Sequence, residues 1–172
     1  MIRLMGILLI MGACLWCGAY FAMREKYRLE ELEELERGLV YLQGQIGYLS
    51  APLSEAMEGA GWRMQGSIGC ILRQVAEALA ARQGETAEEI WRQVWLREGG
   101  KTFLTAEDKR NILAFGHSLG YLDQEQQEKS IALLRHTLSE EGKRGRARLE
   151  KNGRLYYGMG TLSGLLLVVT LL

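Results

Sequence analysis

Few residues in this 172-residue chain have both the type and the spacing that chemistry requires. A metal site needs several converging His, Cys, Asp or Glu ligands, and neither His117 nor His136 has a histidine or cysteine at ligand spacing. The pair Cys14-x-x-Cys17 has the spacing of a redox or zinc motif, but it lies in an apolar run without further ligands. We therefore predict no metal site and no cofactor, and structural or surface roles for both histidines.

The sequence also lacks the motifs of common enzyme classes. It has no G-x-x-x-x-G-K-[ST] phosphate loop, so nucleotide hydrolysis by that route is not expected. Ser50, Ser54 and Ser67 have no nucleophile-elbow context, and the carboxylates mostly follow one another in runs typical of solvated helix faces. We predict no catalytic residues and no enzymatic activity.

The composition predicts an all-α protein. Lys plus Arg and Asp plus Glu are balanced at 21 each, so no net positive charge favours a nucleic-acid partner. The single proline, the many Leu, Ala, Glu, Arg and Gln residues and the lack of alternating strand-like runs favour helices. Cys70 lies among Ile68, Ile71 and Leu72, which predicts a small buried hydrophobe at that position.

The C-terminal stretch 155–172 carries no charge and follows a basic segment. The basic residues are Lys143, Arg144, Arg146, Arg148, Lys151 and Arg154. As a helix the stretch would be about 27 Å long, close to the ~30 Å hydrocarbon core of a bilayer. Tyr156 and Tyr157 at its start are typical of a membrane interface. We predict a transmembrane helix over 155–172, because the alternative of a buried core helix would usually keep a polar face.

A second uncharged run covers residues 4–23. A cleaved signal peptide would have a shorter apolar region, and Met11–Cys14 resembles a lipoprotein cleavage motif only loosely, since the apolar run continues past it. We favour an uncleaved transmembrane helix and leave its processing open. The basic residues next to the two predicted spans lie mostly in the segment between the spans. Because Lys and Arg favour the cytoplasmic side of a membrane, we expect residues 24–154 in the cytoplasm.

Helix signals divide residues 24–154 into about six helices. The first should run from about Arg24 to Leu49, with apolar residues alternately three and four apart. These residues are Leu32, Leu35, Leu39, Leu42, Ile46 and Leu49. Pro52 separates this helix from a short second one over 53–59, and Ser67 is the expected cap of the third. The predicted fold is a six-helix cytoplasmic bundle flanked by two transmembrane helices.

Thr86 and Glu89 form a capping box for the fourth helix. Its apolar face is wide, and it consists of Ile90, Trp91, Val94 and Trp95. Aromatic residues serve both core packing and partner surfaces, so Trp91 and Trp95 have two interpretations. We favour core packing.

Thr105 with Asp108 opens the fifth helix, and Gly120 is its expected end. The predicted buried face of this helix is Ile112, Phe115, Gly116 and Leu119. The sixth helix should start at Asp123 and run about 30 residues toward the membrane at the helical period. Its predicted inner stripe is Ile131, Leu134 and Leu138, continued by the small residues Gly142 and Gly145.

The segment Gly160–Gly164 has the small-x-x-x-small spacing that lets transmembrane helices pack closely. Self-association through Gly160 and Gly164 is one interpretation, and ordinary glycine content is the other. Partner-contacting residues, oligomeric state and gating are not determined by the sequence.

The chain contains, in this order, LSAPLSEA at 49–56, LAFGHSLG at 113–120, Asp123, Gln127, Lys151-Asn152 and Leu155-Tyr156-Tyr157 before the glycine-containing C-terminal stretch. Together these segments resemble the stage III sporulation protein AB family. The glycines at 142 and 145 and the second cysteine of the first span depart from the family pattern.

The resemblance implies a cytoplasmic domain similar to the F-type platform proteins of type II secretion and type IV pilus systems. It also implies a multi-pass protein of the mother-cell membrane that faces the forespore and belongs to the channel between the two cells. The expected partners are a secretion-type ATPase of the same operon, other channel subunits and the lipid bilayer, without nucleic acid. The alternative is a membrane-anchored helical regulator or sensor that binds a peptide or a small ligand.

Overall fold

A computed structural model describes the backbone of residues 2–49, 51–81, 84–119 and 124–171, and the side chains mainly between 23 and 151. These residues form α-helices and two short 3₁₀ helices, and none of them lies in a strand, which confirms the predicted all-α class. The elements are α1 (Ile2–Leu49), α2 (Leu53–Arg63), α3 (Gly66–Ala81), α4 (Ala87–Glu98), η1 (Gly99–Lys101), α5 (Ala106–Phe115), η2 (Gly116–Ser118) and α6 (Gln124–Leu171).

The chain divides into two compact units. One unit contains Met1–Tyr27 and Lys143–Leu172, and the other, which we call the bundle, is Arg28–Gly142. The bundle contains α2–α5 complete, together with the second part of α1 and the first part of α6.

The predicted membrane spans 4–23 and 155–172 both belong to the first unit. Their backbone is helical as far as Leu171, and neither α1 nor α6 is interrupted where the predicted spans meet the predicted domain. Among the described residues, no helix is both long enough and apolar enough to cross a bilayer. The side chains of 155–172 and most of those of 4–23 lie outside the described residues, so the two spans stay a prediction.

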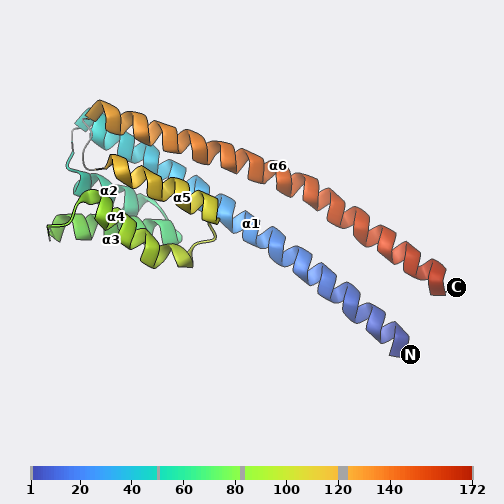
Figure 1. The fold of residues 1–172 in the computed structure, drawn as a ribbon. Coiled ribbons are helices and arrows are strands. Elements are labelled where there is room, and N and C mark those ends of the chain that lie inside the picture. The colour runs from blue at the N-terminus through green and yellow to red at the C-terminus, as the bar shows by residue number, and fades with distance from the viewer. Residues whose placement is uncertain (1, 50, 82–83, 120–123, 172) are drawn as a thin grey trace. The chain divides into compact units, whose positions relative to one another are not determined.

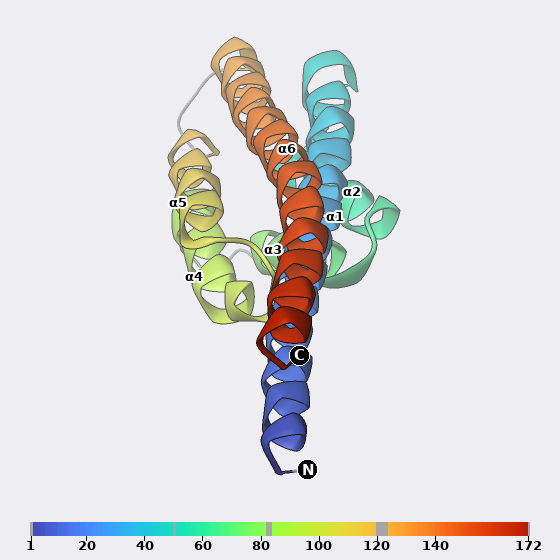
Figure 2. The same ribbon diagram turned by 90° about the vertical axis from the view of Figure 1, so that its right-hand side faces the viewer.

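Within the bundle, α1 and α6 lie side by side and antiparallel, with α2–α5 packed against them (Figures 1 and 2). Arg135 on α6 donates to Gln43 on α1, and Glu128, earlier on α6, lies against Gly47, later on α1. The predicted seam of α1 is buried at Leu32, Leu35, Leu39, Leu42 and Ile46, and the predicted stripe of α6 is buried at Ile131, Leu134 and Leu138. Leu49 is the exception at 66% exposed, because α1 ends there.

The second helix is longer than predicted, since α2 continues past Gly59 to Arg63. Gly59 is helical, and a Cβ added there would lie 2.6 Å from the Tyr41 hydroxyl oxygen, so this glycine serves close packing and not a loop. The third helix begins at Gly66, which has a positive φ of 67°, and the predicted cap Ser67 lies inside it. The Ser67 hydroxyl instead donates to the Lys101 carbonyl at 3.4 Å.

Both predicted capping boxes are present. The Thr86 hydroxyl accepts from the Glu89 amide at 3.2 Å, and the Glu89 carboxylate accepts from the Thr86 amide at 2.8 Å. Thr105 and Asp108 make the same reciprocal pair at the start of α5. Gly120 and Asp123, the predicted end of the fifth helix and start of the sixth, lie outside the described residues.

The prediction that Cys70 is a buried hydrophobe is wrong. Ile68, Ile71 and Leu72 are buried, but Cys70 is exposed, and its nearest polar contact is Gln74 at 3.4 Å. Each residue turns a helix by about 100°, so a position between buried neighbours can still point outward.

A buried ion pair joins α1 to α5. Arg28 Nε donates to Asp108 Oδ2 at 2.7 Å and Arg28 Nη2 donates to Asp108 Oδ1 at 2.8 Å, while Nη2 also lies 3.6 Å from Glu141 on α6. Burial alone would raise the pKa of Asp108, but the hydrogen bonds from Arg28 and Thr105 outweigh it and hold the pKa below its ordinary value. Asp108 therefore stays ionised in the fold.

Asp108→Asn should lower the free energy of unfolding by about 3 kcal/mol or more, because it leaves Arg28 as a buried charge without its main partner. The folded-state pKa of Asp108 is lowered, so the contribution of its carboxylate is complete above the unfolded pKa and is lost as pH falls through the folded one. Denaturant titrations of the purified chain should therefore show a wild-type stability that declines below about pH 4 toward that of the variant.

The matched control is Glu125→Gln, which removes an exposed carboxylate paired with Lys129. Its effect should stay below about 0.5 kcal/mol. Equal effects of the two substitutions would contradict a structural role for the buried pair.

Candidate functional site: a groove between α5 and α6

The two histidines lie on different elements and do not converge. His117 belongs to η2, and its Nδ1 lies 2.6 Å from Glu88 Oε1 on α4. The His117 side chain is exposed and that of Glu88 is half-buried. His136 is exposed on α6. Across the described segments, no three His, Cys, Asp or Glu side chains are grouped to hold a metal ion.

Trp91 and Trp95 belong to the core of the bundle, as the favoured interpretation predicted. They are 1% and 3% exposed, with ring centroids 5.7 Å apart. The Trp91 ring also meets the Phe115 ring edge-on, with centroids 5.5 Å apart. A Cβ at Gly116 would lie 2.6 Å from Trp91 Cδ1, so the glycine allows η2 to approach α4 closely.

The two indoles differ in how their N–H groups are satisfied. Trp91 Nε1 donates to the Ile112 carbonyl at 2.8 Å and so ties α4 to α5. Trp95 Nε1 is buried and has no hydrogen-bond partner among the described residues. A buried donor without an acceptor costs about 1–3 kcal/mol.

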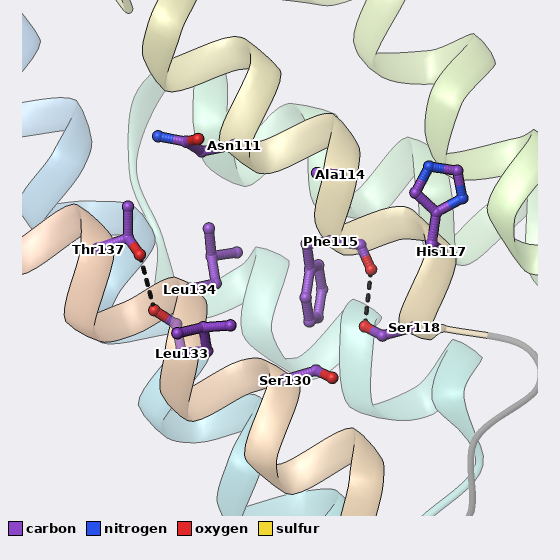
Figure 3. A pocket seen from close by; sticks show the side chains of 9 residues that line it. All are labelled: Asn111, Ala114, Phe115, His117, Ser118, Ser130, Leu133, Leu134 and Thr137. Atoms are coloured by element: carbon purple, nitrogen blue, oxygen red, sulfur yellow. Dashed lines mark hydrogen bonds between the residues drawn. The ribbon is translucent and has the colours of Figure 1, made fainter.

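An open groove of about 340 Å³ lies between α5–η2 and α6 (Figure 3). It is lined by Asn111, Ala114, Phe115, His117 and Ser118 on one side and by Ser130, Leu133, Leu134 and Thr137 on the other. Figure 3 shows Phe115 facing Leu133 and Leu134 across the groove. Phe115 and Leu134 are buried, whereas Leu133 is 68% exposed.

The groove offers mainly apolar surface to a partner, although several of its residues are polar. The Ser118 hydroxyl donates to the Phe115 carbonyl at 2.7 Å, and the Thr137 hydroxyl donates to the Leu133 carbonyl at 3.0 Å. Both hydroxyl protons are therefore used within their own helical turns. An exposed leucine beside a hydrophobic floor, with polar groups at the edge, is the usual composition of a small protein-binding surface.

The sequence predicts Leu134 of this groove as part of the inner stripe of α6, but it does not predict the neighbouring Leu133. A leucine out of phase with a buried stripe is the signal that could have found it.

Comparison with known proteins points to one family. The family model described as stage III sporulation protein AB matches residues 3–172. The chain is 25% identical over 173 residues to stage III sporulation protein AB of Bacillus subtilis (strain 168), with 100% of both chains covered. A solved structure of stage III sporulation protein AB (SpoIIIAB) matches with a TM-score of 0.67 and 19% identity, covering 72% of this chain and 97% of that chain. At this identity the structural match supports the fold alone.

The two tryptophans allow a paired stability test. Trp91→Phe removes the hydrogen bond to Ile112 and leaves a small cavity, so the free energy of unfolding should fall by about 1–3 kcal/mol. Trp95→Phe leaves a similar cavity but also removes the unsatisfied donor, so its cost should be smaller by about 1 kcal/mol or more. Denaturant unfolding measures both, and equal losses would contradict the difference in hydrogen bonding.

Proposed function

Because the chain belongs to the stage III sporulation protein AB family, we propose that it is a non-enzymatic platform subunit of the channel between mother cell and forespore. In this proposal it docks a cytoplasmic secretion-type ATPase and contacts other channel subunits. The observation that carries the proposal is the family match over residues 3–172, together with a relative that is covered over its full length.

The proposed location is the mother-cell membrane facing the forespore, with two spans at 4–23 and 155–172 and a cytoplasmic domain over 24–154. Three observations support it. Both stretches are uncharged, their backbones are helical as far as Leu171, and the neighbouring basic residues lie mostly on the side of the central domain. In this arrangement the domain is anchored to the membrane at both of its ends.

The groove between α5 and α6 is the proposed contact for the ATPase. It lies on the cytoplasmic domain of the proposal, and its apolar floor has one large exposed side chain, Leu133, beside it. Binding energy at protein interfaces concentrates in such apolar pockets surrounded by polar groups that exclude water.

The second candidate function is a regulator or sensor that binds a small ligand or a peptide. The volume of the groove, about 340 Å³, favours it, because small-molecule sites commonly have volumes of about 300–1,000 Å³. The two functions differ in which molecule the groove captures, so a binding measurement with the purified ATPase separates them.

Leu133→Arg should weaken binding of the purified operon-encoded ATPase by about 30-fold or more, because it places a charge beside the apolar floor of the groove. The stability of the chain should change by less than about 0.5 kcal/mol, since Leu133 is 68% exposed. The affinity is measured with the full chain in nanodiscs.

The matched control is Leu96→Arg on α4, where the leucine is 63% exposed and does not line the groove. It should leave ATPase binding unchanged. If both variants bind the ATPase like the wild type, the groove is not the docking site, and capture of a small ligand instead would favour the sensor.

The segment Gly160–Gly164 gives a second test, of assembly in the membrane. Replacing Gly160 and Gly164 with leucine should disrupt close helix packing and lower the fraction of higher-order complexes recovered from membranes by crosslinking. The matched control is Leu162→Ala with Leu165→Ala. These substitutions shorten two side chains of the same segment and leave the glycine spacing intact. Unchanged assembly in the glycine variant would leave 155–172 as a plain anchor.

A further inference from the structure

Two arginines on the bundle lie against aromatic rings. The Arg63 guanidinium on α2 lies 4.0 Å from the centroid of the Tyr41 ring on α1. The Arg73 guanidinium on α3 lies 4.7 Å from the centroid of the Trp62 ring on α2. We call Tyr41, Trp62, Arg63 and Arg73 the arginine–aromatic surface. The two pairs come from α1, α2 and α3, and they are linked through the consecutive residues Trp62 and Arg63 of α2. They share no residue with the groove between α5 and α6.

Each guanidinium is fixed in position by a second contact with the backbone of α2. Arg63 Nη1 donates to the Gly59 carbonyl at 3.2 Å, and Arg73 Nη1 donates to the Gly61 carbonyl at 2.9 Å. Arginines that are held in this way lose less side-chain entropy when they bind a further group. The surface is therefore preorganised.

Neither arginine has an acidic partner among the described residues. Their contacts are the two rings and the two carbonyls, and neither guanidinium forms an ion pair. Glu77 is one helical turn from Arg73 without pairing with it. The Glu58 carboxylate accepts from Trp62 Nε1 at 3.5 Å, so it lies at the edge of the ring that Arg73 covers, but it forms no ion pair with either arginine in the described residues. A guanidinium has five N–H donors, so most donors of both groups are unused.

Capping of α2 explains only part of this arrangement. The bond from Arg73 to the Gly61 carbonyl satisfies a carbonyl in the last turn of α2. It does not explain why Trp62, which Arg73 covers on one side, is 70% exposed. Trp, Tyr and Arg are the residue types enriched at the energetic centres of protein interfaces.

We propose that the arginine–aromatic surface binds an acidic segment of a partner protein. Carboxylates of the segment pair with the in-plane donors of Arg63 and Arg73, and an apolar side chain of the segment lies on the exposed part of Trp62. Charge complementarity identifies the occupant, because two guanidinium groups without counter-charges call for carboxylates. The proposal does not depend on which protein occupies the groove.

The test measures binding of two fluorescein-labelled dodecapeptides to the full chain in nanodiscs by fluorescence anisotropy. One peptide alternates Glu and Ala, and the other has Gln in place of Glu. The Glu peptide should bind about tenfold tighter or more, and Arg63→Gln, Arg73→Gln and Trp62→Ala should each weaken its binding by about tenfold. Thermal unfolding of each variant verifies that the bundle is intact.

The matched control is Arg92→Gln on α4, which removes an exposed arginine that has no ring contact and no ion pair in the described part of the chain. It should change binding of the Glu peptide by less than about twofold, because a single exposed charge contributes little at a distance. Equal binding of the two peptides would overturn the proposal, as would an equal effect of Arg92→Gln.

Sedimentation of the Arg63→Gln, Arg73→Gln double variant distinguishes a second copy of the chain from a different partner. We expect the double variant to keep its oligomeric state and to bind the Glu peptide more weakly. A changed oligomeric state with unchanged peptide binding would show that the surface joins copies of this chain, and it would overturn the proposal.

Discussion

The buried pair between Arg28 and Asp108 is the interaction on which the arrangement of the bundle depends. Asp108 is completely buried, and it serves both as the capping residue of α5 and as the counter-charge of Arg28 on α1. Arg28 in turn lies near Glu141 on α6. A buried charge is tolerated only when its partners are in place, so the start of α5 has one stable position relative to α1 and α6. The groove between α5 and α6 lies along the same helix, whose start this pair ties to α1.

The other end of α5 is held by apolar contacts. Trp91 donates to the Ile112 carbonyl and packs edge-on against Phe115, and the missing side chain of Gly116 leaves room for its ring. Phe115 therefore contacts the core through Trp91 and also lines the groove. The core and the proposed docking surface are thus two sides of the same helix. A change in the packing of Trp91 would shift Phe115 and so alter the lining of the groove.

The bundle presents two surfaces of different chemistry. The groove has an apolar floor and hydroxyl groups that are already bonded to their own backbone, which suits an apolar side chain of a partner. The arginine–aromatic surface has fixed guanidinium groups without counter-charges, which suits carboxylates. A platform subunit that must contact more than one neighbour would use such a difference to keep its partners apart.

The sequence by itself determined the all-α class, both capping boxes and the buried faces of α1, α4, α5 and α6, because each is encoded locally by helical periodicity and by residues three apart. It also contained the segments that identify the family. Only the tertiary structure decided the pairing of Arg28 with Asp108, the exposure of Cys70 and Leu133, and the stacking of Arg63 and Arg73 on rings from other helices. Gly59 shows the physical reason. In the sequence this glycine indicates a loop, but in the fold Tyr41 of the neighbouring helix occupies the space where a side chain at position 59 would lie.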